Sequence, residues 1–156
     1  MRHRDSQRQK LYDAEQAIRD GLGGDLKGRS EALAFVADVT ASKEWKKLVR
    51  RHAGWKTDLL LRGVRVTFAR RKAKATWAVG ANHIHLAAWA VRQRAAILHE
   101  LAHLLNGDLM APFHGPVFTG LFLKLVAVFM SDIHAAVLTD SFARHGVKVA
   151  KRFPRN

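Results

Sequence analysis

The sequence predicts a single α+β domain in which a short run of strands separates two groups of helices. The chain has 156 residues, the size of one domain with one sizeable core. Apolar residues make up 48% of it, as in folded globular proteins. Their spacing changes from helical to alternating and back to helical, without an internal repeat or a long linker.

The first part of the chain, about residues 6–53, is expected to be helical. Ser6 can serve as the N-cap of a helix that stops before Gly21. A second helix is expected after Ser30, and Ser42 can cap its continuation. Apolar side chains recur at helical spacing in these stretches, so each helix is expected to bury one face.

The middle of the chain, about residues 64–88, is expected to form a small antiparallel sheet of three strands. Residues 64–68 alternate apolar with polar side chains, as a half-buried strand does. Strand-like runs at 74–79 and 83–88 follow, joined by a turn that contains a glycine. Because both connections are short, the strands are expected to pair in sequence order, as an antiparallel meander.

Helical spacing then returns for the rest of the chain. A helix over about residues 92–106 is expected to end at Asn106-Gly107, a common signal for the end of a helix. Two helices over about 116–145 and a basic tail, 146–156, complete the domain. The apolar positions of the helix over 92–106 are Ile97, Leu98, Leu101, Leu104 and Leu105.

That first helix carries two histidines four residues apart, with a glutamate beside the first. His99 and His103 leave one face of the helix about one turn apart, so their imidazole nitrogens can share one zinc ion. Glu100 can face a metal-bound water without ligating the metal, accept its proton and pass it to a leaving group. The alternative is a pair of histidines that make ordinary hydrogen bonds.

His114 is the expected third ligand. It precedes Gly115-Pro116, and proline suits the first position of a helix, so His114 would be held where the next helix begins. Three histidines with an open fourth position are typical of catalytic zinc sites. The chain has no cysteine, which excludes thiolate sites and disulfides. The competing ligands are Asp108, Asp132 and His134.

The residues from His99 to Leu105 and from His114 to Phe118 resemble the SprT-like zinc metallopeptidases, which include the Spartan proteases. That family carries HExxH on its active-site helix and a third histidine in an H-G-x-x-[FW] segment shortly after. The resemblance covers about residues 60–130 and implies a zincin-like fold. It also implies zinc ligation by His99, His103 and His114, with Glu100 as the catalytic base.

The pattern of the whole chain, including Arg4-Asp5-Ser6-Gln7-Arg8, is closer still to a family of short metallohydrolases of actinobacteria and their phages. The chain lacks the cysteine-rich zinc ribbon and the long tail with partner-binding motifs of Spartan. The resemblance therefore implies the hydrolytic core, but it gives no support for a role in the removal of DNA–protein crosslinks.

A peptide substrate is expected to add as a strand beside the active-site helix. The segment His83–Leu86 is the predicted edge for this pairing. His83 and His85 lie on one face of the predicted strand, where they could stabilise an oxyanion; solvent-facing strand histidines are the alternative. Peptide hydrolysis is the predicted activity, and cleavage of one regulatory protein is as compatible with the sequence as general proteolysis.

Positive charge is concentrated in two parts of the sequence. The net charge is +14, and the block Lys43–Lys74 holds twelve basic and two acidic residues. The tail adds Lys148, Lys151, Arg152 and Arg155. Such clusters suggest nucleic acid as a partner. A second hypothesis is therefore a nucleic-acid-associated or virion-associated protein whose metal is structural or whose site is inactive.

No segment of the sequence has the pattern of a signal peptide or a transmembrane helix. The N-terminus is basic and polar, and the longest apolar run, 117–130, is too short to span a bilayer. The sequence therefore predicts no membrane partner and a location in the cytoplasm, or in the host cytoplasm if the protein is encoded by a phage.

Overall fold

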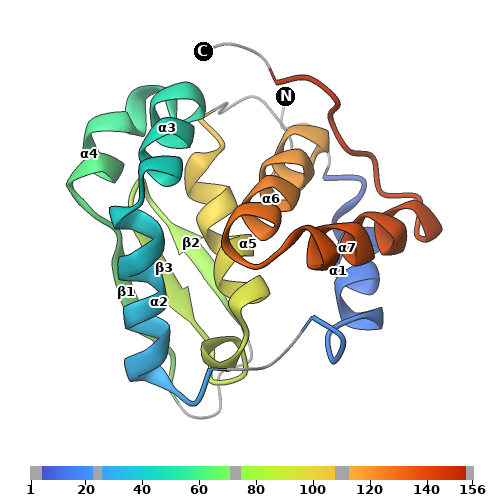
Figure 1. The fold of residues 1–156 in the computed structure, drawn as a ribbon, viewed down its shortest axis with the longest axis horizontal. Coiled ribbons are helices and arrows are strands. Elements are labelled where there is room, and N and C mark those ends of the chain that lie inside the picture. The colour runs from blue at the N-terminus through green and yellow to red at the C-terminus, as the bar shows by residue number, and fades with distance from the viewer. Residues whose placement is uncertain (1–4, 23–25, 71–74, 108–112, 154–156) are drawn as a thin grey trace.

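The computed structural model describes residues 5–22, 26–70, 75–107 and 113–153, and these form a mixed α+β fold with a three-stranded sheet (Figure 1). The helices are α1 (Arg8–Ala17), α2 (Arg29–Ala41), α3 (Lys43–His52), α4 (Thr57–Arg62), α5 (Arg94–Leu105), α6 (Pro116–Phe129) and α7 (Asp132–Arg144). The strands are β1 (Arg65–Phe68), β2 (Trp77–Val79) and β3 (His83–Leu86), and short 3-10 turns cover Gly54–Lys56 and Ala90–Arg92.

The helices lie where the spacing of apolar residues predicts them, with differences at their ends. The Ser42 hydroxyl accepts a hydrogen bond from the Trp45 N–H, which confirms Ser42 as the cap of α3. The prediction for Ser6 is wrong, because Gln7 is the N-cap residue of α1 and its side chain makes no capping hydrogen bond. Helix α4 was not predicted; it is only six residues long and buries Leu60.

The sheet is mixed, so the predicted antiparallel meander is wrong. The strand order is β1-β3-β2, with β1 parallel and β2 antiparallel to β3. Strands β2 and β3 form a hairpin, and Gly80 in its turn has φ of 61°, a left-handed conformation that favours glycine. Alternation of side chains predicts which face of a strand is buried, but it does not predict which strands are neighbours.

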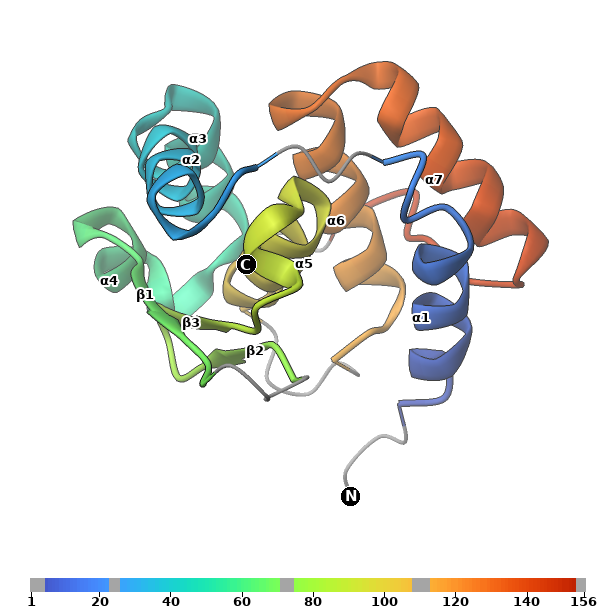
Figure 2. The same ribbon diagram turned by 90° about the horizontal axis from the view of Figure 1, so that it is seen from below.

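Helix α5 lies at the centre of the molecule. The sheet covers one side of it, and α6 packs on another with α7 and α1 beyond it (Figure 2). Its apolar side chains are almost completely buried, together with Ile84 and Leu86 of β3 and Phe118, Phe122 and Leu125 of α6. This burial fixes the position of α5 against the sheet. Among the described residues, no helix is long and apolar enough to cross a membrane.

Glycine at position 107, after the end of α5, allows a close approach to α3. The Gly107 N–H donates to the carbonyl of His52 at 3.1 Å. A Cβ atom at this position would lie 2.6 Å from the backbone of His52 and Ala53. The predicted end of α5 is therefore confirmed, but the glycine is required by packing and not by a left-handed conformation.

Candidate metal centre

Helix α5 presents His99 and His103 on one face, as the four-residue spacing predicts. Their ring centroids are 5.0 Å apart. His114 immediately precedes Gly115, the N-cap of α6, and Pro116 occupies the first turn of that helix as expected. The start of α6 is thus the element that brings His114 back over α5.

The structure brings the three predicted histidines together. One ligand atom of each of His99, His103 and His114 lies within 4.8 Å of the others, so this group could hold a metal ion. The ring of His114 is 5.5 Å from that of His99 and 4.7 Å from that of His103, measured between centroids. The fully buried ring of Phe118, in the first turn of α6, contacts all three imidazoles. An apolar residue behind the donors limits access of water from that side.

A carboxylate contacts the Nδ1 atom of two of these imidazoles. Glu15 Oε1 is 2.9 Å from Nδ1 of His99, and Asp5 Oδ2 is 2.6 Å from Nδ1 of His114. In a neutral imidazole, a carboxylate on Nδ1 keeps the proton there and leaves Nε2 free to ligate a metal. Three imidazole donors, two of them held in this way, fit zinc, while the identity of the metal is not shown by the donors alone.

The surroundings shift the pKa values of the three imidazoles in different directions. Burial lowers the pKa of His99, but the carboxylates of Glu15 and Glu100 outweigh it, so the pKa lies above its usual value. Burial and the neighbouring imidazoles hold the pKa of His103 well below its usual value. Burial also lowers the pKa of His114, although Asp5 opposes the shift. A low pKa keeps an imidazole neutral, which is its ligand form.

Glu100 lies beside this histidine cluster and faces the sheet. The Ala78 N–H of β2 donates to its carboxylate, and Oε2 has no hydrogen-bond partner among the described residues. Burial raises the pKa of Glu100 to about 6. A buried carboxylate with an unsatisfied oxygen is suited to accept a proton from a nearby water.

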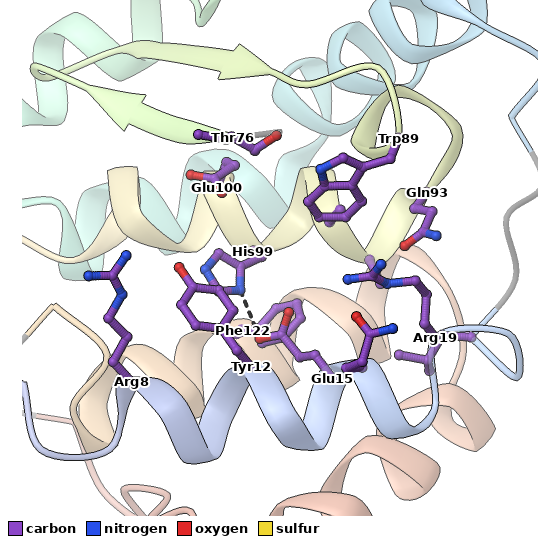
Figure 3. Close-up of a pocket in the computed structure, with 15 residues that line it drawn as sticks. Arg8, Tyr12, Glu15, Arg19, Thr76, Trp89, Gln93, His99, Glu100 and Phe122 are labelled. Carbon is purple, nitrogen blue, oxygen red and sulfur yellow. Dashed lines mark hydrogen bonds and ion pairs between the residues drawn. The ribbon is translucent and has the colours of Figure 1, made fainter. Parts of the chain in front are cut away.

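Two cavities, of about 250 and 380 Å³, meet at Glu100 and are each lined by residues of α1, α5 and the chain leading into β2. Figure 3 shows the smaller cavity, in which Tyr12 and Glu15 of α1 face His99 and Glu100. The larger cavity reaches His103 and His114. Among the described residues, every exposed Phe, Tyr or Trp side chain lines one or both cavities: Tyr12, Trp55, Trp77, Trp89 and Phe113.

The competing ligands that the structure describes do not join the cluster. His134 Nδ1 lies 2.6 Å from the Ser131 hydroxyl at the start of α7. Asp132 is an exposed residue in the first turn of the same helix, and neither residue belongs to the histidine cluster. Asp108 lies outside the described residues.

The prediction that His83–Leu86 is an edge strand is wrong, because β3 is the central strand and pairs on both sides. The strand that lines the cavities is the edge strand β2. His83 and His85 contact the Thr67 hydroxyl at 2.7 and 2.8 Å, on the opposite face of the strand from the core residues Ile84 and Leu86. They therefore have no part in the centre on α5.

The supporting residues Asp5, Tyr12, Glu15 and Lys56 were not predicted from the sequence. Asp5 and Glu15 are 109 and 84 residues from the histidines that they contact, so no local motif links them. Lys56 is 5% exposed, and its ammonium donates to the carbonyls of His103 and Asn106 at the end of α5. Burial lowers the pKa of Lys56 to about 8. A cation there stabilises the negative end of the helix dipole.

The two basic parts of the sequence approach each other in the structure. Helix α3 exposes Lys43, Lys47, Arg50 and Arg51, and the tail exposes Lys148, Lys151 and Arg152. Phe153 at the end of the described tail contacts His52 at the end of α3, with ring centroids 5.0 Å apart. The end of the basic block, 71–74, and Arg155 lie outside the described residues.

Comparisons of the chain with protein-family models, with curated proteins and with solved structures find no match. The chemistry of this centre is therefore inferred from its own residues and their geometry.

Proposed function

We propose that this protein is a zinc-dependent hydrolase that cleaves peptide bonds. The observation that carries the proposal is the cluster of His99, His103 and His114 beside the buried carboxylate of Glu100, at the meeting point of two cavities. Three histidines leave a coordination position for water, whereas structural zinc sites are usually closed by four protein ligands. The resemblance of the two motif segments to SprT-like metallopeptidases supports the same proposal.

The three histidines would hold zinc, which when bound lowers the pKa of a coordinated water to about 7 and polarises the substrate carbonyl. Glu100 would take one proton from the attacking water as the water oxygen forms a bond to the carbonyl carbon. The same carboxyl then delivers the proton to the amine nitrogen as the carbon–nitrogen bond breaks. One water is consumed, and its second proton passes from the new carboxyl group to the released amine, so the products are a carboxylate and an ammonium group.

Tyr12 is the proposed donor to the negative charge that develops on the substrate carbonyl oxygen. Its hydroxyl is 3.5 Å from Nε2 of His114, the nitrogen that would face the metal, and its ring lines both cavities. Burial raises the pKa of Tyr12, so the phenol keeps its proton at neutral pH. A donor already in place when charge develops stabilises the transition state.

A peptide is the proposed substrate because an edge strand borders the cavities. Among the described residues β2 pairs only with β3, so a peptide in extended conformation can lie along its other edge. The exposed aromatic rings of Trp55, Trp77 and Phe113 line the larger cavity, together with Ala78 of β2 and Glu100. Such rings offer contact area to the side chains of an extended substrate.

The direct test measures bound zinc and hydrolysis of a casein substrate by the wild-type protein and by Glu100→Gln. The variant is expected to keep one zinc per chain and to lose about 10²- to 10⁴-fold in kcat, the usual contribution of a general base. Glu44→Gln, a change at an exposed carboxylate on α3, is the matched control and should keep full activity. Full activity of Glu100→Gln, or wild-type protein without stoichiometric zinc, would contradict the proposal.

The second proposed function is binding of nucleic acid by the surface formed by α3 and the tail. The contact between Phe153 and His52 favours it, because this contact joins two basic segments that are far apart in the sequence. Binding through phosphates predicts an affinity that falls steeply with salt. The logarithm of the binding constant should fall with the logarithm of the salt concentration, with a slope of about −0.9 per phosphate contact on duplex DNA. Fluorescence anisotropy with a labelled duplex tests this, comparing wild type with Lys47→Glu/Arg50→Glu. Equal binding by both proteins, or no binding by either, would remove this second function.

A further inference from the structure

The N-terminal segment, residues 5–17, contacts parts of the chain that lie far along the sequence. Helix α1 packs against α7, and Leu11 and Ala14 are completely buried. The hydroxyl of Ser141 in α7 donates to the carbonyl of Ala14 at 2.8 Å. The segment is therefore docked on the C-terminal half of the protein, and its other face is turned to the histidine cluster.

Residues of this segment contact two of the three histidines through side chains. Glu15 contacts Nδ1 of His99, and Asp5 contacts Nδ1 of His114. The ring of Tyr12 stacks on His99, with centroids 5.8 Å apart and planes 16° from parallel, and meets the ring of His114 edge-on at 5.4 Å. These contacts restrain the rotation of both imidazoles, which determines where each Nε2 atom points.

Gln7 attaches the same segment to the backbone around the third ligand. Its side-chain amide donates to the carbonyl of His114 at 2.6 Å and to the carbonyl of Lys148 at 3.1 Å. Its side-chain oxygen accepts from the N–H of Lys148 at 2.9 Å. Gln7 is 8% exposed, so these hydrogen bonds are shielded from water. The N-terminal segment thus holds both the backbone and the ring of His114 in place.

We propose that residues 5–17 are a structural part of the metal site, so that zinc binding and the docking of α1 stabilise each other. Asp5 and Glu15 are positioning residues that hold His114 and His99 with Nε2 toward the ion. If docking of α1 raises the affinity for zinc, zinc must stabilise the docked α1 by the same free energy. This inference rests on zinc binding by the proposed hydrolase, but it concerns a part of the chain that the motif does not include.

The first arm of the test compares zinc affinity, measured by competition with a chromogenic chelator, for wild type, Glu15→Gln and Asp5→Asn. Loss of a carboxylate that holds a ligand imidazole typically lowers metal affinity 10- to 100-fold, and that loss is expected for each variant. Asp13→Asn is the matched control on the same helix. Its carboxylate is exposed and accepts a hydrogen bond from Gln9, so its zinc affinity should equal that of the wild type.

The second arm uses the wild-type protein alone, so it does not depend on the folding of any variant. Hydrogen exchange of the backbone is followed with and without zinc. We expect zinc to slow exchange in α1 while exchange in α2, which lies on the other side of α5, changes less. Both arms have readouts other than catalysis.

The outcomes separate this inference from the proposed function. Absence of zinc binding by the wild type would contradict the proposed hydrolase. Tight zinc binding by the wild type with equal affinities for Glu15→Gln, Asp5→Asn and the control, or with unchanged exchange in α1, would overturn the inference alone. Weaker binding by both variants with slower exchange in α1 would support it.

Discussion

Helix α5 lies between two regions that support it in different ways. On one side, the N-terminal segment contacts the imidazoles of His99 and His114 through the carboxylates of Glu15 and Asp5. On the other side, the region around α3 and α4 contacts the backbone at the end of α5, through the Lys56 ammonium and the close approach at Gly107. The N-terminal segment thus contacts two imidazoles of the cluster, and the region around α3 and α4 contacts the helix that carries His99 and His103.

This difference predicts that the two regions can be separated by experiment. Changes in the N-terminal segment should alter metal affinity and catalysis with a small effect on the stability of the fold. Changes in the region around α3 and α4 should alter the free energy of unfolding with a smaller effect on the metal. The four predictions below test this comparison.

The largest effect is expected from removal of the histidine that the N-terminal segment contacts through both its ring and its backbone. His114→Ala should leave two histidines and therefore no stoichiometric zinc after dialysis, with loss of hydrolysis. His134→Ala is the matched control, because His134 contacts Ser131 in α7 and is not part of the cluster. Metal analysis of the two dialysed proteins checks the prediction; zinc retained by His114→Ala and lost by His134→Ala would reverse the ligand assignment.

On the N-terminal side, Tyr12→Phe is expected to lower kcat by about 100-fold, the lower end of the cost of removing one oxyanion donor. The phenyl ring keeps the stacking on His99, so zinc content should not change. Steady-state kinetics and metal analysis of the same preparation check both parts. If kcat stays at the wild-type value, another group stabilises the oxyanion.

In the region around α3, a fall in pH is expected to destabilise the fold because it favours protonation of the buried His52. Burial lowers its pKa from 6.5 to about 4 in the folded state, so the unfolded state binds more protons between these values. The free energy of unfolding should therefore fall as pH drops through this range, by on the order of 2 kcal/mol from this residue. Urea unfolding of wild type and His52→Gln at pH 7 and pH 4 isolates the effect; an equal loss in both proteins would exclude it.

The smallest effect is expected at the close approach between α3 and the residue after α5. Gly107→Ala places a Cβ atom 2.6 Å from backbone atoms of His52 and Ala53, so the backbone must shift. Overpacking of this kind costs about 1–2 kcal/mol, measured by thermal or urea unfolding. Gly21→Ala is the control, since a Cβ there lies 3.5 Å from the Ile18 carbonyl, an ordinary contact distance. Unfolding of Gly107→Ala at the same urea concentration as Gly21→Ala would show that the contact is not tight.

The helices and the histidine cluster could be predicted from the sequence because both depend on local spacing. Histidines four residues apart share a helix face wherever that helix lies, and proline after His114-Gly115 marks the start of α6. The histidine cluster is confirmed by the geometry. The activity and the metal that it would hold stay predictions until they are measured.

The sheet order and the supporting residues could not be predicted because they depend on distant parts of the chain. Strand β1 pairs with β3 on the edge opposite β2, although β2 lies between them in the sequence. The alternation of side chains along each strand would be the same in this sheet and in a meander. Asp5 and Glu15 look like ordinary charged residues of a polar N-terminal segment. Only the docking of α1 on α7 brings them to the histidines.

The hydrogen bonds of Gln7 have a practical consequence for recombinant protein. Gln7 holds the N-terminal segment against the carbonyl of His114, and Asp5 touches the ring of the same residue. A polyhistidine tag at this end of the chain would add imidazoles that themselves bind zinc, so they would compete with His99, His103 and His114 for the metal. Preparations for metal analysis are therefore best purified without a histidine tag, or with a tag that is removed before zinc is counted.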